Sequence, residues 1–158
     1  MVTIITGKIN SNKTSTMIAH HRKLGCGDGF VSVKNMVGDT VHSYDAMQLS
    51  TEKKQVLIKR DIFYDNDFTV ACSIGPYLFS EETLFYIHKQ VEAMVHANEP
   101  YVFLDEVGVL ELESKGFDLS IKTVLKSNSQ LVMAVREDLV EQLIRHYKIV
   151  NYTILVAK

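Results

Sequence analysis

One stretch near the N-terminus decides the fold prediction: Gly7-Lys8-Ile9-Asn10-Ser11-Asn12-Lys13-Thr14. It follows an apolar run over residues 2–6, which is typical of a buried strand, and it precedes a segment from about 13 to 24 with helical spacing of apolar residues. The stretch reads G-x-x-x-x-N-K-T, one residue away from the phosphate-loop pattern G-x-x-x-x-G-K-[ST]. The sequence therefore predicts a phosphate-binding loop between the first strand and the first helix.

The chemistry of such a loop assigns roles to its residues. Successive backbone N–H groups point at phosphate oxygens, Lys13 is expected on the β- and γ-phosphates, and the Thr14 hydroxyl is expected to bind Mg²⁺. Asn12 stands where the pattern has glycine, so we expect it to adopt the left-handed backbone and its side chain to crowd the phosphates. The predicted nucleotide-binding residues are Gly7, Lys8, Ile9, Asn10, Ser11, Asn12, Lys13, Thr14 and Ser15.

A second apolar strand, predicted over residues 101–104, ends at two acids, Asp105 and Glu106. Ligands bind at the carboxyl ends of strands in an open parallel sheet, so this strand end is expected beside the phosphate loop. Asp105 can hold Mg²⁺ directly or through water, as a Walker B aspartate does. Glu106 is expected to act as the catalytic residue that orients or deprotonates the attacking water.

The rest of the chain predicts an α/β fold of the P-loop NTPase type, a RecA-like three-layer sandwich with a mainly parallel sheet. Three further helices are predicted: one that begins after a Ser80 N-cap and ends near residue 98, and two over residues 117–126 and 137–146. Further strands are predicted over residues 131–135 and 152–156. After the first helix, an antiparallel β-rich insert is expected over about 28–72. Its predicted strands span residues 29–33, 40–44, 55–59 and 68–73.

Length and composition narrow the class of protein. A chain of 158 residues without a linker predicts one domain over 1–158. A net charge of −2 argues against a nucleic-acid-coating surface, and no apolar run approaches the roughly 20 residues of a membrane span. With no signal peptide pattern at the N-terminus, a cytoplasmic location is expected, and with it reduced thiols at Cys26 and Cys72.

The segment after the acidic pair identifies a family: Leu104-Asp105-Glu106-Val107-Gly108-Val109-Leu110-Glu111-Leu112-Glu113-Ser114-Lys115-Gly116-Phe117. It closely resembles the D-E-[IV]-G-x-[ML]-E-L-x-S-x-x-F signature of the THEP1-like nucleoside triphosphatases. The resemblance implies slow, Mg²⁺-dependent hydrolysis of ATP, GTP and other nucleoside triphosphates with broad base tolerance. It places Gly7, Lys13 and Thr14 in the phosphate loop and Asp105 and Glu106 in the Walker B pair, and it leaves Gly108 and Glu111 without an assigned role.

Two questions stay open at the level of sequence. The first is which residue supplies a catalytic cation. Arg136 follows the strand predicted over 131–135 and is one candidate, although an ion pair with Glu137 or Asp138 at the surface is an equal alternative. Lys115 is the second candidate. A nucleotide-binding sensing or assembly module with little turnover is the main rival function. A nucleoside-kinase role is disfavoured because the chain has only four arginines and no arginine-rich lid. The sequence identifies no protein partner.

Overall fold

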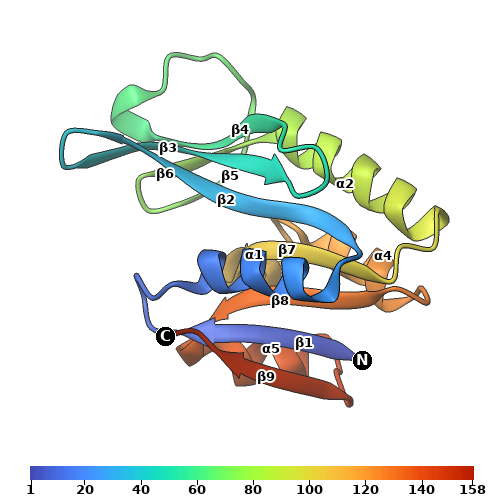
Figure 1. Ribbon diagram of the computed structural model, residues 1–158. Helices are drawn as coiled ribbons and strands as arrows, with labels where there is room; N and C mark the ends of the chain where they lie inside the picture. The colour runs from blue at the N-terminus through green and yellow to red at the C-terminus, as the bar shows by residue number, and fades with distance from the viewer.

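The apolar runs of the sequence form the centre of one nine-stranded sheet, which a computed structural model describes over residues 1–158 (Figure 1). From edge to edge the strands lie in the order β5-β6-β4-β3-β2-β7-β8-β1-β9. The strands are β1 (Val2–Gly7), β2 (Asp28–Val37), β3 (Thr40–Gln48), β4 (Lys54–Arg60), β5 (Val70–Ile74), β6 (Tyr77–Ser80), β7 (Tyr101–Val107), β8 (Gln130–Arg136) and β9 (Tyr152–Val156). The α-helices are α1 (Lys13–Leu24), α2 (Glu81–His96), α3 (Val109–Leu112), α4 (Asp118–Leu125) and α5 (Val140–His146), with single 3₁₀ turns η1 (Asp61–Phe63) and η2 (Glu137–Leu139).

The parallel half of the sheet is the core of the molecule. Strands β2, β7, β8, β1 and β9 pair in parallel. The apolar runs of β1, β7 and β8 are buried on both faces, whereas β9 is a largely exposed edge strand. Because side chains alternate along a strand, Ile4 packs into the larger core cluster and Ile5 into the smaller one on the opposite face. Helix α1 contributes Met17 to the smaller cluster, whereas α2, α4 and α5 cover the other face, which gives three layers.

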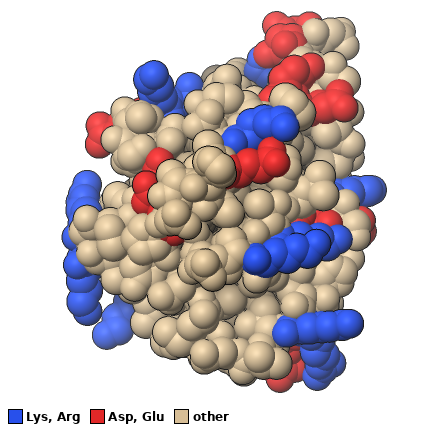
Figure 2. All heavy atoms as spheres, turned by 90° about the vertical axis from the view of Figure 1, so that its right-hand side faces the viewer, with Lys and Arg blue, Asp and Glu red and all other residues tan.

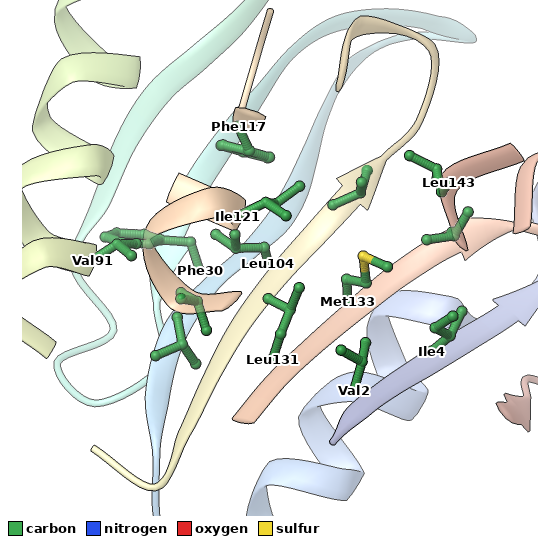
Figure 3. Packing of buried hydrophobic residues seen from close by; sticks show 14 of the residues in the cluster. Val2, Ile4, Phe30, Val91, Leu104, Phe117, Ile121, Leu131, Met133 and Leu143 are labelled. Atoms are coloured by element: carbon green, nitrogen blue, oxygen red, sulfur yellow. The ribbon is translucent and has the colours of Figure 1, made fainter. Parts of the chain in front are cut away.

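The larger core cluster joins three strands to the helices above them. Figure 3 shows side chains of β1, β8 and β7 pointing toward side chains that precede or belong to α4 and α5. The labelled residues of this cluster are Val2, Ile4, Phe30, Val91, Leu104, Phe117, Ile121, Leu131, Met133 and Leu143. Packing of these buried side chains fixes the positions of the parallel strands. It thereby also fixes where the carboxyl ends of β1 and β7 lie.

Strand β2 belongs to both halves of the sheet. Its residues 28–30 pair in parallel with β7, and its residues 30–37 pair with β3 in antiparallel register. The antiparallel half, β2-β3-β4-β6-β5, therefore projects beyond the carboxyl end of β7 (Figure 1). This projection places one face of the antiparallel strands opposite the phosphate loop.

Several elements differ from the sequence prediction. Three insert strands, β2, β3 and β4, are longer than predicted, whereas the strand predicted over 68–73 is the five-residue β5 (Val70–Ile74). The antiparallel section also continues past residue 72, because the short β6 (Tyr77–Ser80) pairs with both β4 and β5. Helix α3 is four residues long, which is too short for a periodic pattern to predict. The segment predicted as a helix over 137–146 begins with the 3₁₀ turn η2. The predicted N-cap is confirmed, since the Ser80 hydroxyl accepts a hydrogen bond from the Thr83 N–H at 3.1 Å.

The surface carries charges of both signs. Figure 2 shows the end of the molecule where the parallel strands begin, and there Lys and Arg side chains are interspersed with Asp and Glu, apart from one acidic corner. None of the helices is both long enough and apolar enough to span a lipid bilayer.

Candidate functional site

The two predicted motifs meet at one point. The Thr14 hydroxyl donates a hydrogen bond to Oδ2 of Asp105 at 2.7 Å, across 91 positions of sequence. Thr14 lies in the first turn of α1, and Asp105 lies near the end of β7. A cavity of about 730 Å³ opens here, and its lining comes from residues 9–15, the end of β7, the start of α3, and the antiparallel strands. The carboxyl edge of the parallel sheet thus holds the site, as the sequence predicts.

The phosphate loop closes in a different way from the prediction. The left-handed residue is Asn10, with φ of 62°, whereas Asn12 has φ of −82°. The Asn12 side chain does not turn into the loop, because its Nδ2 donates to the carbonyl oxygen of Lys158 at 2.9 Å. The expectation of a left-handed backbone at Asn12 is therefore wrong. Gly7 leaves room for Ser11: a Cβ at position 7 would lie 2.4 Å from the Ser11 Oγ, so that side chain would have to move.

Lys13 is held inside this loop. The residue is only 8% exposed, and its ammonium donates to the Lys8 carbonyl oxygen at 2.8 Å and to the Ser11 hydroxyl at 3.3 Å. Lys8 itself is exposed, so only its backbone takes part. A buried ammonium at the N-terminal turn of a helix is an arrangement that attracts phosphate.

Asp105 is the centre of a small hydrogen-bond network. The residue is 3% exposed; its Oδ2 accepts from the Thr14 hydroxyl and from the Ser32 N–H at 3.0 Å, and its Oδ1 accepts from the Glu106 N–H at 2.9 Å. Burial raises the pKa of Asp105, and these hydrogen bonds act in the opposite direction. Carboxylate and hydroxyl oxygens are the ligand types that Mg²⁺ prefers, so the Thr14–Asp105 pair fits that ion.

Glu106 projects into the cavity from a break in β7. The pairing of β7 with β8 shifts register between Leu104 and Val107, and Glu106 takes a left-handed backbone with φ of 58°. Glu106 is an exposed residue, and it lines the cavity. Burial, followed by the charge of Asp105, raises the pKa of Glu106. A carboxylate with a raised pKa in a cavity is suited to accept a proton.

The two candidate cations are placed differently. Arg136 lines the cavity, and its Nε donates to Oδ1 of Asp138 at 2.6 Å. Lys115 does not line the cavity, and its nearest partner is Glu113 at 3.9 Å. Sequence reasoning missed Lys34 of β2, which also lines the cavity and is close enough to Glu106 to lower that carboxyl's pKa. The alternation of polar and apolar residues in the insert is the sequence signal that could have identified the strand face on which Lys34 lies.

Glu111, which had no assigned role, organises the segment after β7. Its Oε1 accepts from the Gly108 N–H at 2.6 Å, and its Oε2 accepts from the Phe117 N–H at 2.9 Å. Burial raises the pKa of Glu111 to about 7, while the backbone N–H groups oppose that change. Gly116 leaves room for this carboxylate, since a Cβ at that position would lie 2.3 Å from Oε2. Glu111 therefore holds residues 108–117 against the cavity.

Comparisons with known proteins agree with this geometry. A family model described as NTPase matches residues 2–157. Among solved structures, the chain is similar to the solution structure of a human cancer-related nucleoside triphosphatase, with a TM-score of 0.65 and 19% identity over 99% of this chain and 88% of that one. This similarity confirms the predicted α/β fold. No curated protein matches the chain.

Proposed function

This chain belongs to the NTPase family, whose members hydrolyse nucleoside triphosphates, and from that premise we propose that the loop over residues 7–15, Asp105 and Glu106 form its Mg²⁺-dependent hydrolytic site. The observation that carries this proposal is the 2.7 Å hydrogen bond between Thr14 and Asp105. It brings the loop that would hold the phosphates to the strand end that would hold the metal ion. The resemblance to the THEP1-like family supports turnover that is slow and tolerant of different bases, with ATP and GTP both accepted.

In this proposal, Thr14 and Asp105 would hold Mg²⁺, with water and phosphate oxygens completing its shell. The bound ion would neutralise charge on the β- and γ-phosphates. Lys13 would exchange its hydrogen bonds with Lys8 and Ser11 for bonds to phosphate oxygens. The backbone N–H groups of the loop and of the first turn of α1 would bind the remaining oxygens.

Glu106 would orient the lytic water and accept its proton. The left-handed backbone at Glu106 turns the carboxylate out of the strand line and into the cavity. Its raised pKa makes the carboxylate a stronger base than an ordinary glutamate. Arg136 would contact the transferring phosphoryl group through its two terminal nitrogens, because only its Nε is taken by Asp138.

The test is phosphate release from ATP and GTP with Mg²⁺, alongside nucleotide binding by calorimetry. Glu106→Gln is expected to lower kcat about 10²- to 10⁴-fold while nucleotide still binds, because the base is lost and the phosphate loop is intact. Lys13→Ala is expected to weaken both binding and turnover. Matched controls are Glu113→Gln and Lys89→Ala, which change exposed side chains outside the cavity and should behave as wild type.

Two results would contradict this assignment. If Glu106→Gln hydrolyses ATP at the wild-type rate, another group serves as the base. If the wild-type chain binds nucleotide but releases no phosphate, the rival function of a sensing module is the better description. Omitting Mg²⁺ and adding a chelator should abolish release, and an unchanged rate would exclude the proposed metal role for Thr14 and Asp105.

A further inference from the structure

The end of strand β9 lies beside the phosphate loop. The Ala157 N–H donates a hydrogen bond at 2.7 Å to the carbonyl oxygen of Thr6, the last residue before the loop. Ala157 is buried and packs in the smaller core cluster with Met17 of α1. These contacts fix the position of the next residue, Lys158, and Figure 1 shows the C-terminal end of the structure beside the segment that joins β1 to α1.

One hydrogen bond ties the main chain of Lys158 to this segment. The Asn12 Nδ2 donates to the Lys158 carbonyl oxygen at 2.9 Å, across 146 positions of sequence. Asn12 immediately precedes α1 and occupies its N-cap position. An asparagine at an N-cap usually turns its side-chain oxygen toward the helix, where it accepts from the N–H of the second or third helical residue. In α1 those two residues are Thr14 and Ser15.

Asn12 does not cap α1 in this way. Its side chain makes no capping hydrogen bond, and its φ of −82° and ψ of 47° lie outside the extended region that a capping residue adopts. Neither the Thr14 N–H nor the Ser15 N–H donates to the Asn12 side chain or to a carbonyl oxygen of the preceding loop. Both N–H groups are therefore left for an acceptor from outside the loop.

The same two N–H groups are needed by a phosphate. N–H groups at a helix N-terminus bind phosphate oxygens, so a side chain that already accepts from them would have to be displaced first. The phosphate-loop pattern has glycine at position 12, and glycine avoids this competition because it has no side chain. Asn12 has a side chain that is well suited to capping, so a contact that holds this side chain away from α1 favours phosphate binding.

We propose that the Lys158 carbonyl oxygen is a tether that positions Asn12, so that the Asn12 side chain cannot cap α1 and the first N–H groups of the helix stay free for a triphosphate. This inference rests on the proposed function of the loop. Asn12 is then a positioning residue, because it acts through the N–H groups of Thr14 and Ser15. The tether also makes the end of β9 part of the nucleotide site, although β9 lies at the sheet edge, on the far side of β1 from Asp105.

The first experiment releases the tether and measures affinity. Ala157→Pro removes the N–H that anchors the end of β9, so Asn12 is free to cap α1. Calorimetry with a non-hydrolysable ATP analogue and Mg²⁺ should show binding weakened about fivefold or more, because the phosphates must now displace a cap. Val156→Ala is the matched control, since it shortens a neighbouring exposed side chain, keeps every N–H group and should bind as wild type.

A second chemical background separates tethering from simple packing. In the Asn12→Gly chain, Ala157→Pro should cause no further loss of affinity, because glycine has no side chain to release. Asn12→Ser reaches the capped state without a change in β9: serine is a preferred N-cap, but it lacks the amide that Asn12 donates to Lys158. We expect Asn12→Ser to weaken binding of the analogue as Ala157→Pro does, and it decides the question if Ala157→Pro does not fold.

Amide hydrogen exchange, followed by NMR, detects the cap without any nucleotide. The Thr14 and Ser15 N–H groups should exchange quickly in the wild-type chain, and at least one of them should exchange more slowly in Ala157→Pro and in Asn12→Ser. The exchange should be fast again when Ala157→Pro is combined with Asn12→Gly. Circular dichroism verifies that each variant is folded.

Two results overturn the proposal. An equal loss of affinity from Ala157→Pro with and without Asn12→Gly would mean that β9 supports the loop by packing alone. Unchanged exchange at both amides in Asn12→Ser and Ala157→Pro would mean that no cap forms when the tether is released. If the wild-type chain binds no nucleotide, the hydrolytic assignment fails separately, and the exchange rates still decide whether the tether holds Asn12 away from α1.

Discussion

Asn10 carries the left-handed backbone of the phosphate loop, a conformation that costs most side chains about 1–2 kcal/mol and that asparagine tolerates. We therefore expect Asn10→Ala to lower the free energy of unfolding by about 1 kcal/mol and to weaken nucleotide binding, because the loop no longer closes without strain. Asn10→Gly should be tolerated. Urea unfolding and calorimetry measure both effects, and equal stability of the alanine and glycine variants would show that the loop relaxes at no cost.

Glu111 makes the stability of the folded chain depend on pH. In the folded state its pKa is about 7, above the 4.5 of an ordinary glutamate, so the unfolded state loses its proton first as pH rises. The contribution of this group to stability is therefore complete below pH 4.5 and is lost between about pH 4.5 and 7, by about 3 kcal/mol. Glu111→Gln should remove this decline, as seen in unfolding curves recorded from pH 4 to 8.

The control for this experiment lies in the same segment. Glu113 is an exposed acid two positions further along, and Glu113→Gln should keep the wild-type slope of stability against pH. An identical slope in Glu111→Gln and wild type would mean that Glu111 titrates normally. It would then follow that its two backbone N–H donors outweigh the effect of burial.

At the scale of elements, the contact between β2 and β7 decides whether the antiparallel half is placed correctly. Gly29 has φ of 154°, and a Cβ there would lie 2.1 Å from the carbonyl oxygen of Phe103. Gly29→Ala should therefore separate the two strands and destabilise the fold by about 3 kcal/mol or more. Gly38→Ala is the control: its φ is 59° but nothing lies within 4 Å, so a cost of about 1 kcal/mol is expected. Equal losses in thermal unfolding would refute the close-contact argument.

The elements that the sequence predicts correctly are those with a clear period or a clear cap. Strand β1 is mainly apolar and buried throughout, and α2 has both the Ser80 cap and a regular apolar face. Elements set by tertiary pairing were missed, since the four residues of β6 are ordered by neighbours on both sides. Short segments carry too little local preference to compete with such contacts.

The candidate site likewise has one part that the sequence predicts and another part that depends on tertiary pairing. Thr14, Asp105 and Glu106 follow from motif spacing, because a loop after one strand and acids after another share the carboxyl edge of the sheet. The antiparallel side of the cavity could not be predicted in this way, because Tyr44 of β3 and Tyr77 of β6 meet only through the pairing of both strands with β4. The backbone of the loop was also beyond prediction: the bond from Asn12 to Lys158 depends on where β9 ends.

At the scale of the whole molecule, we expect nucleotide binding to raise the free energy of unfolding. A ligand that binds only the folded state adds about 2.7 kcal/mol at one hundred times its dissociation constant, or roughly 5–10 °C in Tm for a chain of this size. We expect ATP with Mg²⁺ to raise the Tm of wild type and of Glu106→Gln, since both bind, and to leave Lys13→Ala nearly unchanged. Differential scanning fluorimetry measures this shift, and an equal shift in Lys13→Ala would place the nucleotide elsewhere.

Strand β2 runs without interruption from the parallel core into the antiparallel half, with ladder hydrogen bonds on either side of it. In mechanical terms it is a cantilever: a beam clamped at one end whose free end bears a load. A beam of this kind bends slightly but does not swing, so we expect the face of the antiparallel strands to keep its distance from the phosphate loop. We expect any opening that admits substrate to come instead from the loop over residues 8–12, which belongs to no strand or helix.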